Sequence, residues 1–225
     1  MSNALAILLL LAAIAPAGSA PQTIESGPWS ITAGPVGPDA IRYKGQTLVQ
    51  RARVGGFLPD WKGGRFAFDG ARLTPAPDGA TWEKQVPGNQ DAALKVSAAG
   101  NTLTLALKTT LRTAGPTEYS VELSPEAVRA GETHCSILLS GKHENLDLVE
   151  GFRQFWGVRE IRFEQPERTV ILRAEGIGLQ DRRDRDQGLF LIVALNSDGK
   201  APKEEARTVE IEVVEAKPEE IPARR

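Results

Sequence analysis

The sequence predicts an all-β chain folded as a large two-sheet antiparallel β-sandwich. Short runs of residues alternate between apolar and polar side chains, which is the period of half-buried strands. Glycine, proline or asparagine separates these runs, and the 22 glycines and 15 prolines suit many short strands joined by tight turns. After residue 20 no run has the clear period of an amphipathic helix, so we expect no helical layer.

The first twenty residues, MSNALAILLLLAAIAPAGSA, predict a secretory signal peptide. An apolar core over residues 5–15 precedes small residues that end in Gly-Ser-Ala, the pattern of a cleavage site after Ala20. The apolar run is too short to span a bilayer comfortably, and no second run of membrane length follows. We therefore expect a secreted or periplasmic protein with no membrane span in the mature chain. The predicted parts are a signal peptide (residues 1–20), a single β-sandwich domain (21–215) and a flexible C-terminal tail (216–225).

Three turns and four strands are the clearest elements of the domain. In each turn a glycine or asparagine accepts a positive φ at low cost. Residues 188–196, GLFLIVALN, are nearly all apolar, which indicates a central strand covered on both faces. Residues 124–131, SPEAVRAG, are expected to form one helical turn. The turns are expected at Lys44-Gly45, Asp69-Gly70 and Gly100-Asn101, and the alternating strands over 101–111, 118–123 and 208–215, with Leu103, Leu105, Leu107, Tyr119, Val121, Leu123, Val209, Ile211 and Val213 on their apolar sides.

Composition and motifs exclude several classes of function. The formal net charge is −2 and the sequence has no basic segment, which argues against a nucleic-acid partner. Cys135 is the only cysteine, so no intrachain disulfide can form, and its apolar neighbours predict a buried, inert thiol. The sequence has no phosphate-binding loop, dinucleotide fingerprint or serine nucleophile elbow, and we expect no cofactor and no metal. The oligomeric state stays open.

The segment from Asp181 to Asp186 reads DRRDRD and interleaves three aspartates with three arginines. A calcium loop places oxygen ligands at alternate positions, and three guanidinium groups among them would repel a dication. We interpret the segment as a connection with paired charges that leads into the apolar run at 188–196. The alternative is sugar recognition, in which Asp181 and Arg182 bond vicinal hydroxyls or the acid group of a uronic or sulfated sugar.

Catalytic groups are only weakly marked. Glycoside hydrolysis needs two carboxyl groups that face one cleft, and Glu210 and Glu212 have that spacing along one strand face. This pair and the glutamates of residues 118–123 lie on the polar sides of alternating strands, so a solvated outer face is the simpler interpretation. The two histidines do not have metalloprotease spacing. His143, expected on a loop, is the weak candidate for a catalytic residue.

Tryptophans in glycine-rich segments indicate a ligand more clearly. Trp61 lies in GFLPDWKGGRF, and Trp156 lies in GFRQFWGVREIRF close to Arg153. An aromatic ring on a loop would stack against the CH face of a pyranose, and an arginine beside it would bond the hydroxyls or acid group. The alternative is that these rings close the ends of the sandwich core. Trp29 and Trp82 lie within strand-like runs and are expected in the core.

Three segments, AIRYKGQTLV, LQDRRDRDQGLFLIVAL and DGKAPKEEARTVEIEVVE, carry a resemblance to a known family. They resemble the opening hairpin, a late Asp-Arg element before a buried strand, and the closing strand of the galactose-mutarotase-like supersandwich. The resemblance covers most of residues 28–215 and implies the fold of sugar mutarotases and of accessory domains in glycoside hydrolases and polysaccharide lyases. For the mutarotase reaction it implies a histidine acid and a glutamate base. Neither His134 nor His143 matches that context, which counts against mutarotase activity.

The sequence alone favours a non-catalytic protein that binds carbohydrate or polysaccharide, or assists polysaccharide handling outside the cytoplasm. In this interpretation Trp61 and Trp156 stack on a sugar, and Arg153, Asp181 and Arg182 bond its polar groups. Two alternatives stay open. One is a glycoside hydrolase, lyase or sugar epimerase on the same fold, and the other is an envelope structural or interaction protein without a ligand. A concave face with exposed tryptophans favours binding, a cleft that joins the candidate histidine to a carboxylate favours an enzyme, and a convex surface with both tryptophans buried favours the structural role.

Overall fold

The structure is a computed structural model whose described residues form β-strands and turns, with no helix among them. This confirms the predicted all-β class. The structure describes residues 22–59, 61, 63–125, 127–128, 133–146, 153–181, 188–195 and 200–216, with only the backbone of Arg153. The strands are β1 (Gln22–Ser26), β2 (Trp29–Gly34), β3 (Gly37–Tyr43), β4 (Gln46–Phe57), β5 (Gly64–Ala67), β6 (Arg72–Ala76), β7 (Gly79–Val86), β8 (Gln90–Ala99), β9 (Thr102–Leu111), β10 (Thr117–Leu123), β11 (His134–Leu139), β12 (Lys142–Leu146), β13 (Arg153–Gln165), β14 (Arg168–Asp181), β15 (Leu189–Leu195) and β16 (Lys203–Glu215).

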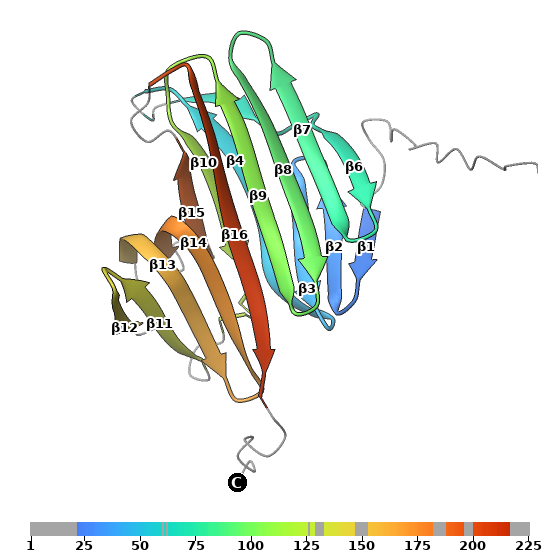
Figure 1. Ribbon diagram of the computed structural model, residues 1–225, viewed down its shortest axis with the longest axis vertical. Helices are drawn as coiled ribbons and strands as arrows, with labels where there is room; N and C mark the ends of the chain where they lie inside the picture. The colour runs from blue at the N-terminus through green and yellow to red at the C-terminus, as the bar shows by residue number, and fades with distance from the viewer. Residues whose placement is uncertain are drawn as a thin grey trace, which may run out of the picture.

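These strands belong to one antiparallel sheet that folds into two layers (Figure 1). The order along the sheet is β1-β2-β3-β4-β10-β15-β14-β16-β9-β8-β7-β6. In Figure 1 strands β16, β9, β8, β7 and β6 form the front layer, and β1 to β4 with β10 and β15 form the back layer. Strand β5 pairs with the end of β4. Strand β13 pairs with β14, and the β11–β12 hairpin pairs with β13, so these strands form a separate lobe. The arrangement confirms the predicted large two-sheet sandwich.

Strand β14 connects the two layers. Its residues 168–173 pair with β16 of the front layer, and its residues 177–181 pair with β15 of the back layer. Between these halves the register with β13 shifts, and Gly176 adopts a φ of 68°. Only glycine takes this left-handed conformation without steric cost, so a glycine inside a strand commonly marks a bend. The irregularity therefore lies where the strand changes its partner and its layer.

The space between the layers is an apolar core. All residues predicted to lie on the apolar sides of the three alternating strands are buried, and Cys135 is buried as well. Trp29 and Trp82 are fully buried, as predicted. Trp29 of β2 donates its indole N–H to the carbonyl of Gly100 at 3.1 Å, and Trp82 of β7 donates to Gly34 at 2.9 Å. Each indole thus links one layer to the other, because each acceptor belongs to the opposite layer.

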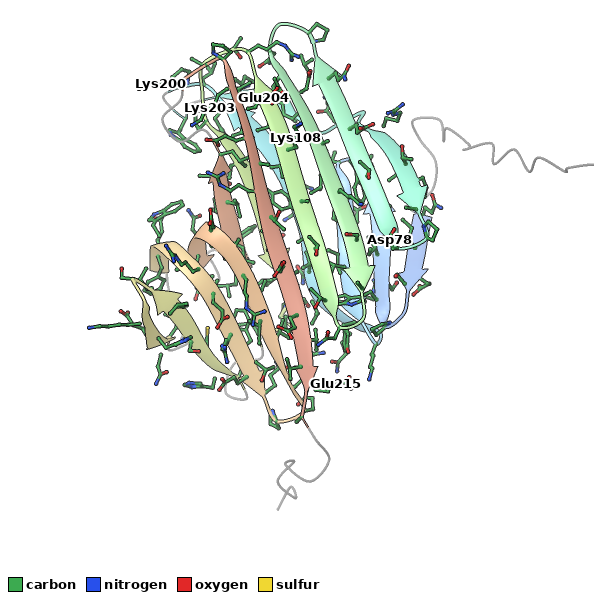
Figure 2. All side chains as sticks on the ribbon, in the orientation of Figure 1. Asp78, Lys108, Lys200, Lys203, Glu204 and Glu215 are labelled. Atoms are coloured by element: carbon green, nitrogen blue, oxygen red, sulfur yellow. The ribbon has the colours of Figure 1, made fainter. Side chains whose placement is uncertain are left out.

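The predicted turns are present. Lys44 and Gly45 have φ values of 47° and 81°, and a two-residue hairpin turn of this type needs a positive φ at both positions. Residues 69–70 and 100–101 are turns as well. The Lys44 ammonium group lies 2.6 Å from Oε1 of Glu215, which Figure 2 labels at one end of β16. This ion pair joins a turn of the back layer to the end of a front-layer strand.

Strand β15 is a central strand, as predicted, because it lies between β10 and β14. Leu191 and Val193 face the core, and Ile192 on the opposite side is buried too, whereas Phe190 and Ala194 are partly exposed. A helical turn is predicted over residues 124–131. The described residues of this segment form a turn whose hydrogen bonds join residues three apart. The rest of that segment, the predicted signal peptide and the predicted tail beyond residue 216 lie outside the described residues.

Candidate functional site

The side of the back layer that faces away from the core carries a cross-strand set of polar and aromatic residues. Residues directly opposite each other in antiparallel strands point to the same side of the sheet. Two such rows cross β4, β10, β15 and β14. We call this side the outer face. Its rows are Arg51, Glu122, Phe190 and Gln180, and Arg53, Ser120, Ile192 and Gly178.

A pocket of about 180 Å³ lies on the outer face. Arg51 donates hydrogen bonds from Nε at 2.9 Å and from Nη2 at 2.5 Å to Oε2 of Glu122. Glu122 is only 8% exposed, so the expectation of a solvated carboxylate there is wrong. A buried carboxylate needs a hydrogen-bonded counter-charge, and Arg51 supplies it. The pocket is lined by Arg51 and Arg53 of β4, Ser120 and Glu122 of β10, and Phe190 of β15.

Trp156 borders the outer face on the β14 side. Its side chain is 50% exposed, although it lies in strand β13 and not in the loop that the sequence predicts. The register between β13 and β14 shifts across this position, which is a β-bulge or a similar irregularity. A Cβ atom on Gly178 would lie 2.4 Å from Cζ3 of the Trp156 ring. The ring therefore occupies the space that the missing side chain of Gly178 leaves on the outer face.

Trp61 borders the same face on the β4 side. It is 48% exposed in the loop between β4 and β5, and its ring centroid lies 5.2 Å from that of Phe57. The Phe57 ring in turn approaches the Cβ position of Gly55 to 3.4 Å on the outer face. Trp61 has a φ of 62°, a strained conformation for a bulky residue. Its backbone N–H donates to the carbonyl of Leu58 at 2.9 Å. Trp61 is therefore exposed beside Phe57 on the β4 side of the outer face.

Arg65 fixes the base of this loop from the core side. It donates hydrogen bonds to the carbonyl of Phe57 at 2.9 Å, to Asn89 at 2.8 Å and to Gln90 at 2.8 Å. Burial lowers the pKa of the Arg65 guanidinium below its ordinary value. This polar network contacts the backbone of Phe57, whose ring lies beside Trp61.

The two exposed tryptophans lie at opposite sides of the outer face. Phe57 rests on Gly55 of β4, and Trp156 rests on Gly178 of β14, with β10 and β15 between them. Three strand spacings separate β4 from β14, which amounts to about 14 Å. The charged pocket lies between the two aromatic positions, on β4, β10 and β15, and Gln180 and Ile192 on its β14 side are buried. A ligand that touches both rings must be wider than one sugar ring.

The five residues predicted to bind a sugar do not all share this face. Arg153 and Asp181 are opposite each other in β13 and β14, but only the backbone of Arg153 is described. Asp181 is opposite Leu189 of the core and is 5% exposed, so it points to the other side of the sheet from Trp156. Arg182 lies outside the described residues. The structure therefore leaves Trp61 and Trp156 at the two sides of the outer face and places Asp181 on the other side of the sheet.

The predicted catalytic candidate lies far from the pocket. His143 is exposed in the edge strand β12, not in a loop, and β11, β13 and β14 separate that strand from β15. His134, at the start of β11, is exposed as well. In the described residues, no group of three or more histidine, cysteine, aspartate or glutamate side chains is placed to hold a metal ion. The described part of the chain also contains no helix long and apolar enough to cross a membrane.

The carboxylate pair Glu210 and Glu212 lies on the outer side of the front layer. Glu212 accepts a hydrogen bond from Arg173 at 2.6 Å, and Arg173 also donates to Glu160 at 2.8 Å. Burial raises the pKa of Glu160, but hydrogen bonds from Arg162 and Arg173 outweigh burial and hold that pKa below its ordinary value. A second pocket of about 310 Å³ lies here, lined by Arg159, Arg173, Ala174, Glu175, Thr208 and Glu210.

One local sequence pattern indicates the pocket. In RARVG, residues 51–55, arginine alternates with apolar residues, which places Arg51 and Arg53 together on the side of β4 opposite Ala52 and Val54. Nothing in the sequence showed that Glu122 of β10 would lie beside them. That neighbour is set by the pairing of β4 with β10, which are far apart in the chain.

Comparison with known proteins identifies the fold. No protein-family model matches the chain, and no curated protein matches its sequence. Among solved structures, a candidate aldose 1-epimerase from Escherichia coli K12 matches with a TM-score of 0.61 and 11% identity, over 88% of this chain and 99% of that one. A galactose mutarotase related enzyme from Lactobacillus acidophilus matches with a TM-score of 0.58 and 10% identity, over 86% and 97%. An aldose epimerase homologue from C. elegans matches with a TM-score of 0.59 and 10% identity, over 88% and 100%.

The chain has the galactose-mutarotase-like fold. This confirms the resemblance predicted from the sequence, and the match extends over nearly the whole length of these structures. At about one identical residue in ten, the likeness shows the fold alone. The function must therefore be argued from the outer face of this chain.

Proposed function

We propose that the protein binds carbohydrate on its outer face, without catalysis, as part of polysaccharide handling outside the cytoplasm. The observation that carries the proposal is the presence of two half-exposed tryptophans, Trp61 and Trp156, beside one charged pocket. Large exposed aromatic side chains that gather on one face of a protein mark interaction sites. The secreted location is supported by the signal-peptide pattern of residues 1–20.

The chemistry of the face suits a sugar. The rings of Trp61 and Trp156 offer flat apolar surfaces to the CH groups of a pyranose, while Arg53 and Ser120 offer hydrogen-bond donors to its oxygens. Four of the described residues that line the pocket are charged or polar, and Phe190 adds one aromatic ring beside them. The fold adds support, because the matching structures include a candidate aldose 1-epimerase and a galactose mutarotase related enzyme, both named for sugar chemistry.

A binding role is favoured over an enzyme. His143 lies on the edge strand β12, far from the pocket, so it cannot act on a sugar held there. In the pocket itself the one carboxylate, Glu122, is held by Arg51 through two hydrogen bonds. General acid–base catalysis needs a group that can reach the substrate and exchange a proton with it. Among the described residues that line the pocket, no second group is placed for that task.

Affinity electrophoresis in gels that contain soluble polysaccharides tests the proposal. We expect at least one polysaccharide to retard the purified chain, and Trp61→Ala and Trp156→Ala each to reduce the retardation. Val214→Ala is the matched control, because Val214 is an exposed apolar residue on the front layer. Reducing ends are measured in the same samples. Release of product would replace the binding role with an enzyme, and unchanged retardation in both tryptophan variants would remove the outer face from the proposal.

A further inference from the structure

We infer that the ligand of the outer face is an anionic saccharide, whose acid group binds Arg53. This inference rests on the proposed carbohydrate binding and adds the class of sugar. It comes from the charges of the pocket, which are unequal. Arg51 and Arg53 are positive and Glu122 is negative, so the described side chains that line the pocket carry one net positive charge.

The positive charge is located on one side chain. Arg51 is occupied, because its guanidinium binds Glu122 through two nitrogen atoms. Arg53 is exposed, and no residue in the described part of the chain forms an ion pair or side-chain hydrogen bond with it. Glu118 lies diagonally across from Arg53 on the same face, but it is engaged in another interaction. The guanidinium of Arg53 is therefore free to bind a ligand.

The position of Arg53 relates the charge to the aromatic rings. Arg53 lies two residues before Gly55, on which Phe57 and then Trp61 rest. It is also in the same cross-strand row as Gly178, against which the Trp156 ring of β13 packs. An acid group held at Arg53 would thus belong to a sugar chain that extends toward one or both rings. A planar guanidinium binds a carboxylate or a sulfate through two parallel hydrogen bonds, which a neutral hydroxyl cannot offer.

Removing the negative charge of Glu122 should have the opposite effect on binding to removing the positive charge of Arg53. Its carboxylate lies in the pocket lining and lowers the positive charge that an incoming anion meets. Glu122→Gln keeps a hydrogen-bond acceptor for Arg51 and removes the negative charge. We therefore expect this variant to bind the anionic ligand more tightly. A neutral sugar would not respond in this way.

The experiment uses two pairs of polymers, each with the same backbone in acidic and neutral form. Polygalacturonate is compared with its methyl ester, and dextran sulfate with dextran, in affinity gels at two salt concentrations. We expect retardation by the acidic member of one pair only, which also identifies the acid group as a carboxylate or a sulfate. Arg53→Gln should weaken the affinity for that polymer at least about tenfold, which is the smallest loss expected when a pair of hydrogen bonds between charged groups is removed. Glu122→Gln should strengthen it.

Lys108→Gln is the matched control, because it removes one positive charge from the front layer, where Figure 2 labels Lys108 on β9. Thermal unfolding of each variant separates lost binding from lost folding. Equal retardation by the acidic and neutral members, or retardation that is the same in Arg53→Gln, overturns the inference and leaves carbohydrate binding in place. Equal losses in Arg53→Gln and Lys108→Gln also overturn it, since they indicate a general charge effect. Absence of retardation by all four polymers counts against both proposals.

Discussion

Replacing Gly178 with alanine is expected to displace the Trp156 ring while the sheet stays folded. The new Cβ atom would lie 2.4 Å from Cζ3, 2.6 Å from Cε3 and 3.1 Å from Cη2 of Trp156. Carbon atoms in contact stay about 3.5–4.0 Å apart, so the ring must retreat by about 1 Å or more. Gly178 does not have a left-handed φ, so alanine fits its backbone. Alanine also costs about 0.5–1 kcal/mol less than glycine within a strand, which offsets the displacement.

The expected result is a change in binding with little change in stability. The free energy of unfolding should change by less than about 1 kcal/mol, because the backbone gain and the ring displacement oppose each other. Loss of an aromatic stacking contact is worth about 0.5–1.5 kcal/mol, so affinity for the saccharide should fall between about twofold and tenfold.

Acrylamide quenching of tryptophan fluorescence follows the ring itself. Of the four tryptophans, Trp29 and Trp82 are fully buried, so the accessible signal comes from Trp61 and Trp156. Trp156→Phe separates the two exposed contributions. Wild-type affinity in Gly178→Ala, together with altered quenching, would show that the position of the ring does not matter for binding. A fall in stability well above 1 kcal/mol would show that the ring is part of the packing.

Three further predictions concern stability. Trp82→Phe removes the indole N–H that reaches Gly34 at 2.9 Å, and chemical denaturation should show a loss of about 1–3 kcal/mol for the unpaired carbonyl and the lost volume. Gly79→Ala would place its Cβ 1.9 Å from the backbone oxygen of Val96, so the same measurement should show a loss above about 3 kcal/mol or no folded protein. Glu160 has a lowered pKa, so its ion pairs contribute stability above about pH 4.3, the ordinary value, and this contribution disappears as the pH falls through the lower folded value. Between about pH 5 and 3 the wild type should therefore lose more stability than Glu160→Gln, and equal losses would contradict the assignment.

The strands could be predicted from the sequence because every second residue of a half-buried strand is apolar. Leu103, Leu105 and Leu107 are buried in β9, and Thr104 and Ala106 between them are not. Turn residues were equally informative, since the Lys44-Gly45 hairpin needs two positive φ values. Both signals are local. They come from residues that lie next to each other in the chain.

The passage of β14 between the layers could not be predicted in this way. Alternation shows which residues are buried, but it does not show whether a strand pairs with β15 or with β16. The change of partner depends on hydrogen bonds to segments far away in the chain. The glycine at 176 was the one local sign, and a glycine alone does not distinguish a bend from a turn.

The candidate site was predicted in part for the same reason. Trp61 and Trp156 stood out because tryptophan is rare and both lie near glycines, and the structure leaves both half exposed. Asp181 stood out by charge, but its neighbour Leu189 places it on the core side of the sheet. Glu122 looked like an ordinary solvated residue of an alternating strand. Glu122 can be buried because Arg51 supplies its counter-charge. Only the pairing of β4 with β10 brings Arg51 beside it.

The glycines beneath the rings give the strongest reason to separate binding from packing at this face. Phe57 covers Gly55, and Trp156 covers Gly178. An aromatic ring over a glycine protects the backbone of a sheet, so such a pair alone is explained by stability. A ring that serves only this purpose gains by being buried, since each square ångström removed from water contributes about 25 cal/mol. Trp156 stays 50% exposed, and half of its surface therefore contributes nothing to folding while it remains available to a ligand.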